Sequence, residues 1–387
     1  MSHEPVAHEP LVGLDAVLVQ AGSGTSSPGA QAALMREGEL VWSGTFGVAE
    51  IGGDRPVTRD TVFCLASLGK TLVAALALRL VEQNVLDLDA PIGRVVTEVP
   101  GADVVTPRML LTHTSGYSDV YETPELAPLF PAEGEIEGGT SYDPERRFTW
   151  EMLLPGFRDP VKPGERWEYS NGGYILLTEL MVRLLGGPEA LAEAWNSLAG
   201  RVGDGRITEN LLTLDRSCPG PDRLAHGYVV NPDGALVDAY AAHSPSGVPT
   251  DLFGLPFGDG LFAGTAVGVA TFLDGLFVRR TVLDVVTLEL MTTTTAQAAA
   301  AVRDVPDPAL ATYGMGTFRT EAAGGTWQGH RGTYGGFNVL GMSDVGRGVT
   351  FAVLTNVMGE EPAAMPIWRA LAEALGAQSV TTGAGEG

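Results

Sequence analysis

A serine and a lysine three residues apart stand at the start of a strongly apolar helical segment of this 387-residue chain. Ser67 and Lys70, at positions i and i+3, share one face of a helix. Arginine supplies 22 of the 24 basic side chains, so Lys70 is expected to do something that arginine cannot. A partly buried lysine can lose its proton and act as a base. The pair predicts a serine nucleophile beside a lysine base; the alternative is a helix-capping serine followed by a solvated lysine.

Gly69-Lys70-Thr71 also matches the end of a phosphate-binding P-loop. That motif needs a glycine five residues before Gly69 so that the backbone can curl around a phosphate. Cys64 occupies that position. The sequence therefore argues against nucleotide binding.

Two later segments carry further polar side chains. Tyr169 and Asn171 are two residues apart; a tyrosine hydroxyl near a lysine can shuttle a proton, and an amide can orient a substrate. His330 and Arg331 follow a short strand expected at 327–329, and strand alternation sends them to opposite faces. Taken alone, Tyr169 is by default a loop tyrosine with its hydrogen bonds satisfied, and the alternative for His330 is a strand histidine bonded to a neighbour.

The elements that must position these residues follow from periodicity. The helix starting at Ser67 is expected to run to Gln83 with Asn84 as its C-cap, and its apolar 72–78 run predicts a buried, central position. Other helices are expected at 11–20, 176–185, 191–199, 265–278 and 363–375. Strands are expected at 30–35, 39–46, 61–65, 225–230, 235–240, 313–319, 327–329, 336–342 and 349–354.

Strands at both chain ends with helices between them predict an α/β (α+β) fold. We expect an antiparallel sheet flanked by helices and built from both chain ends, with a large, mainly helical domain inserted. The predicted boundaries are 1–66 and 275–376 for the sheet domain, 67–274 for the helical domain and 377–387 for a flexible tail. Residues 119–147 form a long irregular stretch with four prolines, which is often functional.

Composition restricts the partners. The formal charge of −23 argues against nucleic acid, which needs a basic face. No apolar run is long enough to cross a membrane. The first ten residues lack the pattern of a secretory signal, and two cysteines fit a reducing compartment, so a cytoplasmic location is expected. Nothing in the sequence implies a metal or an organic cofactor.

Together, Ser-x-x-Lys at 67, Tyr-x-Asn at 169 and His-x-Gly at 330 resemble the serine β-lactamase and penicillin-binding-protein superfamily. The chain is most similar to its class C β-lactamase-like branch, which includes DD-peptidases, D-aminopeptidases, esterases and transacylases. The resemblance covers about residues 10–376. Further matching segments are Asp60-Thr61-Val62-Phe63, Val85-Leu86-Asp87-Leu88-Asp89, Leu110-Leu111-Thr112-His113-Thr114-Ser115-Gly116, Tyr313-Gly314-Met315-Gly316 and Leu354-Thr355-Asn356.

The resemblance implies an acyl-enzyme mechanism. Ser67 would be the nucleophile and Lys70 would take its proton. Tyr169 would pass protons to the leaving group and then activate the acceptor, and Asn171 would hold a substrate amide or support the lysine. The main-chain N–H groups of Ser67 and Thr333 would form the oxyanion hole.

Two positions depart from true β-lactamases of this group. True β-lactamases of this group carry lysine where this chain has His330. The histidine variant is more typical of DD-peptidases, D-aminopeptidases and peptide-cyclising relatives, so it argues against antibiotic hydrolysis. Arg331 replaces a small hydroxylated residue; it would either clamp a substrate carboxylate or face solvent. Gly332 and Thr333 complete the expected substrate-binding segment, and His113 matches a structural motif of the family.

Three functions remain open. The first is a hydrolase that cleaves an ester or amide bond of a small molecule through acylated Ser67. The second is a transacylase that passes the acyl group from a small-molecule donor to an amine or alcohol, with residues 119–147 shielding the site from water. The third is a catalytically silent binding protein on the same fold. The sequence does not predict the oligomeric state.

Overall fold

A single antiparallel sheet built from both ends of the chain organises the molecule. The computed structural model describes residues 13–129, 148–202, 211–213, 223–239, 258–260, 262–304 and 312–383. Seven strands follow one another in the order β2-β1-β12-β11-β10-β9-β8. They are β1 (Gly29–Arg36), β2 (Glu39–Gly47), β8 (Thr312–Tyr313), β9 (Phe318–Ala322), β10 (Gly325–Tyr334), β11 (Phe337–Asp344) and β12 (Val349–Thr355). The predicted α/β class and the antiparallel sheet from both chain ends are confirmed.

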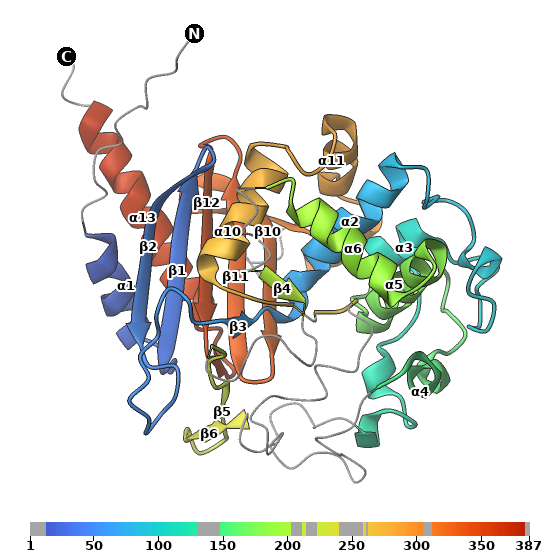
Figure 1. The fold of residues 1–387 in the computed structure, drawn as a ribbon, viewed down its shortest axis with the longest axis horizontal. Coiled ribbons are helices and arrows are strands. Elements are labelled where there is room, and N and C mark those ends of the chain that lie inside the picture. The colour runs from blue at the N-terminus through green and yellow to red at the C-terminus, as the bar shows by residue number, and fades with distance from the viewer. Residues whose placement is uncertain are drawn as a thin grey trace.

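Helices cover both faces of this sheet, which explains why its central strands β1, β11 and β12 are buried along almost their whole length. Figure 1 shows α1 (Leu14–Ser23) and α13 (Ala364–Gly383) on one face and α10 (Ala266–Leu273) on the other. Neighbouring residues of β12 divide between two hydrophobic cores: Phe351 packs in the core beneath α1 and α13, and Ala352 in the larger core on the other face. Strand alternation therefore decides which side chains of the sheet face the candidate site.

The remaining helices gather beside the sheet (Figure 1). They are α2 (Gly69–Glu82), α3 (Pro107–Leu111), α4 (Trp150–Leu153), α5 (Asn171–Leu185), α6 (Pro188–Ala199), α11 (Val285–Thr292) and α12 (Ala296–Asp304). Helix α2 packs against α5, α6 and α11. Every residue from Gly69 to Leu78 is buried, which confirms the central position predicted from its apolar run.

Two small three-stranded sheets accompany the large sheet. One has the order β3-β7-β4 and the other β13-β5-β6. The strands are β3 (Phe63–Cys64), β4 (Leu211–Thr213), β5 (Tyr228–Val230), β6 (Leu236–Asp238), β7 (Phe262–Gly264) and β13 (Val357–Met358). Pairing of β3 with β7 leads the chain directly into the turn that carries Ser67.

Three boundaries differ from the sequence prediction. Ser67 lies in a 3₁₀ turn, η1 (Ala66–Leu68), and α2 begins only at Gly69. Strand β10 continues through the residues expected to follow it. Helix α13 extends beyond its predicted end at 375, so most of the predicted tail is helical, because one glycine costs a helix only about 1 kcal/mol.

The predicted division into two domains stays a prediction. Helix α10, which the predicted boundaries place in the helical insertion, packs on the large sheet. Much of the irregular 119–147 stretch and Cys218 lie outside the described residues. Among the residues described, no helix is both long and apolar enough to cross a membrane.

Candidate functional site

The side chains of Ser67 and Lys70 meet where η1 runs into α2. Nζ of Lys70 lies 2.9 Å from Oγ of Ser67. Lys70 has an exposed fraction of 0%, whereas Ser67 is half-buried. Ser67 is the N-cap of neither element, and no side-chain cap bond forms at either. The alternative of a capping serine followed by a solvated lysine is therefore wrong.

Lys70 has two further hydrogen-bond partners, both oxygen atoms. Its Nζ donates to Oδ1 of Asn171 at 2.7 Å and to the main-chain oxygen of Asp259 at 2.6 Å. The aromatic ring of Tyr169 lies beside it, with 5.0 Å between Nζ and the ring centroid. Two of the residues singled out in the sequence, Ser67 from η1 and Asn171 from α5, therefore contact the buried amine of Lys70 on α2, with Tyr169 next to it.

The main chain around Ser67 is tightly enclosed. The preceding residue, Ala66, has a φ of 46°, a left-handed conformation that costs a non-glycine residue roughly 1 kcal/mol or more and is often found at active sites. A Cβ on Gly260 would lie 2.6 Å from the main-chain carbon of Ala66. A Cβ on Gly332 would lie 2.2 Å from the carbonyl oxygen of Leu65 and 3.0 Å from the nitrogen of Ser67. Two glycines thus let separate chain segments approach the turn from both sides.

Strand β10 brings the third predicted motif to this turn, since β10 packs directly against η1. Thr333 is exposed, and its Oγ1 accepts a hydrogen bond from Nδ2 of Asn338 at 2.7 Å. The close approach of Gly332 to the nitrogen of Ser67 fits the pair of main-chain donors that the family resemblance implies. The oxyanion hole formed by Ser67 and Thr333 stays a prediction.

Arg331 points away from Ser67. It is the direct cross-strand partner of Leu340, and directly opposed residues share a face of the sheet. Leu340 belongs to the core beneath α1 and α13. The guanidinium of Arg331 lies over the ring of Phe318, 5.9 Å from its centroid. The structure therefore does not favour Arg331 as a carboxylate clamp at the serine, because strand alternation places it on the opposite face.

Tyr313 joins His330 to His113 in a buried hydrogen-bond chain. Its hydroxyl lies 3.2 Å from Nε2 of His113 and 3.3 Å from Nε2 of His330. Nδ1 of His113 accepts from the N–H of Ser170 at 3.2 Å, so Nε2 carries the proton and donates to Tyr313. Nδ1 of His330 donates to the carbonyl of Arg331 at 2.6 Å, and its Nε2 accepts from Tyr313.

The imidazoles of His113 and His330 in this hydrogen-bond chain are both held neutral. Burial is the main cause that lowers the pKa of His330 to about 3 and the pKa of His113 well below its ordinary value. The ring of His113 also stacks against Tyr169, with 4.2 Å between centroids. The surroundings of His113 fit the structural role that the resemblance implies. Both ring nitrogens of His330 are occupied by protein groups.

Comparison with known proteins identifies the family. A family model described as Beta-lactamase matches residues 14–376. The chain belongs to this family. The matched range includes Ser67, Lys70, Tyr169, Asn171 and His330.

Curated relatives match only parts of the chain. Esterase EstB of Burkholderia gladioli is 42% identical over 109 residues, which cover 27% of this chain and 28% of the esterase. A penicillin-binding protein of Bacillus subtilis (strain 168) is 28% identical over 194 residues, 50% of this chain and 40% of the relative. Monacolin J acid methylbutanoyltransferase of Aspergillus terreus is 27% identical over 189 residues, 42% of this chain and 44% of the transferase. These matches span less than half the length of each relative.

Solved structures match the fold over almost the whole chain. The D-amino acid amidase from Ochrobactrum anthropi SV3, complexed with L-phenylalanine amide, superimposes with a TM-score of 0.74. The alignment covers 96% of this chain and 98% of the amidase, at 22% sequence identity. The likeness therefore concerns the fold, and the chemistry has to be argued from the site of this beta-lactamase family member.

Sequence reasoning missed three polar residues of the site. Asp119 accepts from Nδ2 of Asn171 at 2.6 Å, and the hydroxyl of Tyr121 donates to Oδ2 of Asp259 at 2.5 Å. Asp259 is 189 residues away from Lys70 along the chain, so no local spacing indicates it. Asp119 and Tyr121 follow the Thr-Ser-Gly segment at 114–116 that carries part of the resemblance, and they open the irregular 119–147 stretch, but neither signal indicates these two residues individually.

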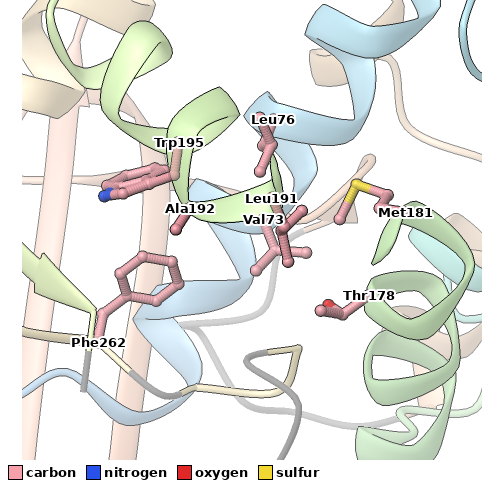
Figure 2. Close-up of a pocket in the computed structure, with 8 residues that line it drawn as sticks. All are labelled: Val73, Leu76, Thr178, Met181, Leu191, Ala192, Trp195 and Phe262. Carbon is pink, nitrogen blue, oxygen red and sulfur yellow. The ribbon is translucent and has the colours of Figure 1, made fainter. Parts of the chain in front are cut away.

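An apolar cavity lies behind the helix that bears Lys70. Figure 2 shows its lining side chains, which come from α2, α5, α6 and β7. Its volume is about 30 Å³, room for little more than one water molecule. The lining side chains are Val73, Leu76, Thr178, Met181, Leu191, Ala192, Trp195 and Phe262. The cavity includes none of the polar residues around Ser67, and we do not interpret it as a substrate site.

Proposed function

We propose that this protein is a serine hydrolase that cleaves an ester or amide bond of a small molecule through an acyl-enzyme on Ser67. One observation carries the proposal: a fully buried lysine amine lies 2.9 Å from the hydroxyl of a half-exposed serine. A serine hydroxyl is a weak nucleophile until a neighbouring base takes its proton. Lys70 is positioned to be that base.

The proposed reaction balances in two steps. The proton of Oγ passes to Nζ of Lys70 while Oγ bonds to the substrate carbonyl carbon. The bond to the leaving alcohol or amine then breaks, and the leaving group takes a proton, with the phenol of Tyr169 as the proposed carrier. Water adds to the acyl-enzyme, loses a proton by the same route and releases the acid and free Ser67. The net reaction consumes one water and needs no cofactor.

The direct test is acylation of Ser67 in the protein. A fluorophosphonate probe should add to wild type, with loss of fluoride, and peptide mass spectrometry should place the adduct on Ser67. Ser67→Ala should remain unmodified. Wild type that stays unmodified under conditions where the probe is intact would exclude this function and favour a catalytically silent binding protein.

A transacylase is the second candidate, in which an alcohol or amine takes the acyl group in place of water. The partial match to a methylbutanoyltransferase supports it, because the same acyl-enzyme serves both reactions. Incubating the protein with a p-nitrophenyl ester and a series of alcohols and amines, then measuring the ratio of acyl-transfer product to free acid, separates the two. A ratio that stays at zero for every acceptor, with acid still formed, supports the hydrolase.

A further inference from the structure

The hydrogen bonds of Lys70 suit an amine that exchanges a proton with Ser67. The main-chain oxygen of Asp259 and Oδ1 of Asn171 can accept hydrogen bonds but cannot donate them. A neutral lysine amine has two N–H groups and one lone pair. If the two N–H groups point at these two oxygens, the lone pair is left for the hydroxyl proton of Ser67. After transfer, the new N–H points back at Oγ, and no other bond has to change.

This arrangement depends on which end of the Asn171 amide faces Lys70. Asp119 fixes that choice: its Oδ2 accepts from Nδ2 of Asn171 at 2.6 Å and from the main-chain N–H of Asn171 at 3.4 Å. A carboxylate accepts and cannot donate when ionised, so the amide nitrogen turns to Asp119 and Oδ1 turns to the lysine. Asn171 is also the first residue of α5, where the helix dipole favours an anion.

The second acceptor is fixed from the same short segment. The hydroxyl of Tyr121 donates to the half-buried carboxyl group of Asp259 at 2.5 Å, and the carbonyl of the same aspartate accepts from Lys70 at 2.6 Å. Oδ1 of Asp119 in turn accepts from the main-chain N–H of Tyr121 at 3.2 Å and caps η3 (Val120–Glu122). One turn of chain thus holds both fixed oxygen acceptors of the lysine.

We propose that Asp119 and Tyr121 are positioning residues that orient the two oxygen acceptors of Lys70, so that its third position is left for Ser67. The catalytic consequence rests on the proposed function, whereas the orientation of Lys70 does not. Neither residue touches the serine; each acts through a neighbour, Asp119 through Asn171 and Tyr121 through Asp259.

Three variants and one matched control test the kinetic consequence. Asp119→Ala and Tyr121→Phe should react with the fluorophosphonate roughly 10- to 100-fold more slowly than wild type, because small misplacements of a reacting group cost about that much. For p-nitrophenyl acetate, kcat should fall similarly while KM stays within about 2-fold. Asp119→Asn should recover only part of the rate, since its single amide oxygen can accept from Asn171 or from the N–H of Tyr121 but does not replace both carboxylate oxygens. Tyr117→Phe, which loses a hydroxyl bond to the carbonyl of Pro100 in the same loop, should behave as wild type.

The scarcity of lysine supplies a readout that does not depend on activity. The chain has only Lys70 and Lys162, and Lys162 is exposed, with a side-chain exposed fraction of 66%. Protein labelled with ¹³C and ¹⁵N in lysine should therefore give two sets of side-chain NMR signals. Asp119→Ala and Tyr121→Phe should move the Lys70 signals and leave those of Lys162 in place, and Tyr117→Phe should move neither.

The two measurements separate the possible failures. Unchanged Lys70 signals in both variants would overturn the positioning role even if wild type is acylated. Shifted signals in a protein that the probe never labels would support the positioning role and remove the proposed function. If Asp119→Ala does not fold, Tyr121→Phe decides alone, because it removes a single oxygen atom.

Discussion

Gly332 lies against the main chain of Leu65, where a Cβ added to the glycine would come within 2.2 Å of the leucine carbonyl oxygen. Main-chain atoms cannot move aside as a side-chain tip can. Gly332→Ala should therefore push β10 away from η1 and separate the two predicted oxyanion donors. We expect acylation to slow roughly 10²- to 10³-fold, the effect of losing one such donor. Stopped-flow measurement of the p-nitrophenolate burst checks this.

Gly376→Ala is the matched control, because its added Cβ would find only the Arg347 side chain, at 3.9 Å. It should fold and react as wild type. An alanine at 332 that leaves the burst rate unchanged would show that β10 does not contribute a donor to the reaction at Ser67.

Lys70 cannot be replaced by arginine if it works as a base. A guanidinium stays protonated in proteins, so Lys70→Arg should lose about 10²- to 10⁴-fold in acylation rate, the range for a general base. Lys70→Met, a neutral side chain of similar shape, should be equally slow. Fluorophosphonate labelling measures both, with Lys162→Arg as the control expected to keep the wild-type rate. A fast Lys70→Arg variant would assign the base to another group.

His330 makes the stability of the protein depend on pH. Its pKa is about 3 in the folded protein, against an ordinary value of 6.5. Between these values the unfolded chain binds more protons, so the free energy of unfolding falls as the pH falls, by up to about 1.4 kcal/mol per pH unit. His330→Gln should lose less stability between pH 7 and pH 4.5 than wild type does.

Urea unfolding at a series of pH values measures that difference. The comparison with the variant matters because burial raises the pKa of Asp259, and a carboxyl group of raised pKa stabilises the fold as the pH falls. The pKa of His113 is lowered in the same direction as that of His330. The free energy of unfolding of the variant should therefore still fall somewhat as the pH falls. Parallel curves for the two proteins would mean that His330 is not held neutral.

The side chains that line the cavity behind α2 include one unpaired hydroxyl group. Oγ1 of Thr178 is buried among the apolar side chains drawn in Figure 2, with no hydrogen-bond partner among the described residues. Replacing it with a methyl group of the same shape removes the cost of burying a polar atom. Thr178→Val should raise the free energy of unfolding by about 1 kcal/mol, measured by urea denaturation.

Thr71→Val provides the opposite case on the neighbouring helix. Oγ1 of Thr71 donates to the carbonyl of Gly316 at 2.6 Å, so its removal leaves a buried oxygen without that donor and should cost about 1–3 kcal/mol. Equal effects of the two substitutions would contradict the assignment of Thr178 as unpaired.

Much of the fold could be predicted because its signals are local. The apolar 72–78 run predicted that α2 is a buried helix. Strands β1 and β12, which pair with each other, were visible as apolar runs near the two chain ends. Helix α3 was missed although Thr106 caps it and Pro107 occupies its first turn, a recognisable start signal. Strand β10 was predicted too short because Gly332 weakens a strand; pairing with β11 carries it through Thr333.

The site could be predicted only at positions where the residue type or its spacing is unusual in this sequence. The scarcity of lysine pointed to Lys70, and helix spacing pointed to Ser67. The partners that orient the lysine come from distant segments and carry common residue types, so neither Asp119 nor Asp259 has a spacing that indicates it. Arg331 was left with two alternatives because the side of a strand facing the site depends on which helices cover each face.

The pairing of Ala30 with Thr355 has a consequence for synthesis on the ribosome. A nascent chain can present the turn that carries Ser67 once about a fifth of the message has been read, yet β12 lies between β1 and β11 in the sheet. Until β12 has been translated, β1 lacks one of its two neighbouring strands. The strands β11 and β10 are then not joined to β1, and β10 is not held against the turn. The arrangement of residues around Ser67 is therefore expected to be incomplete while the chain is being made.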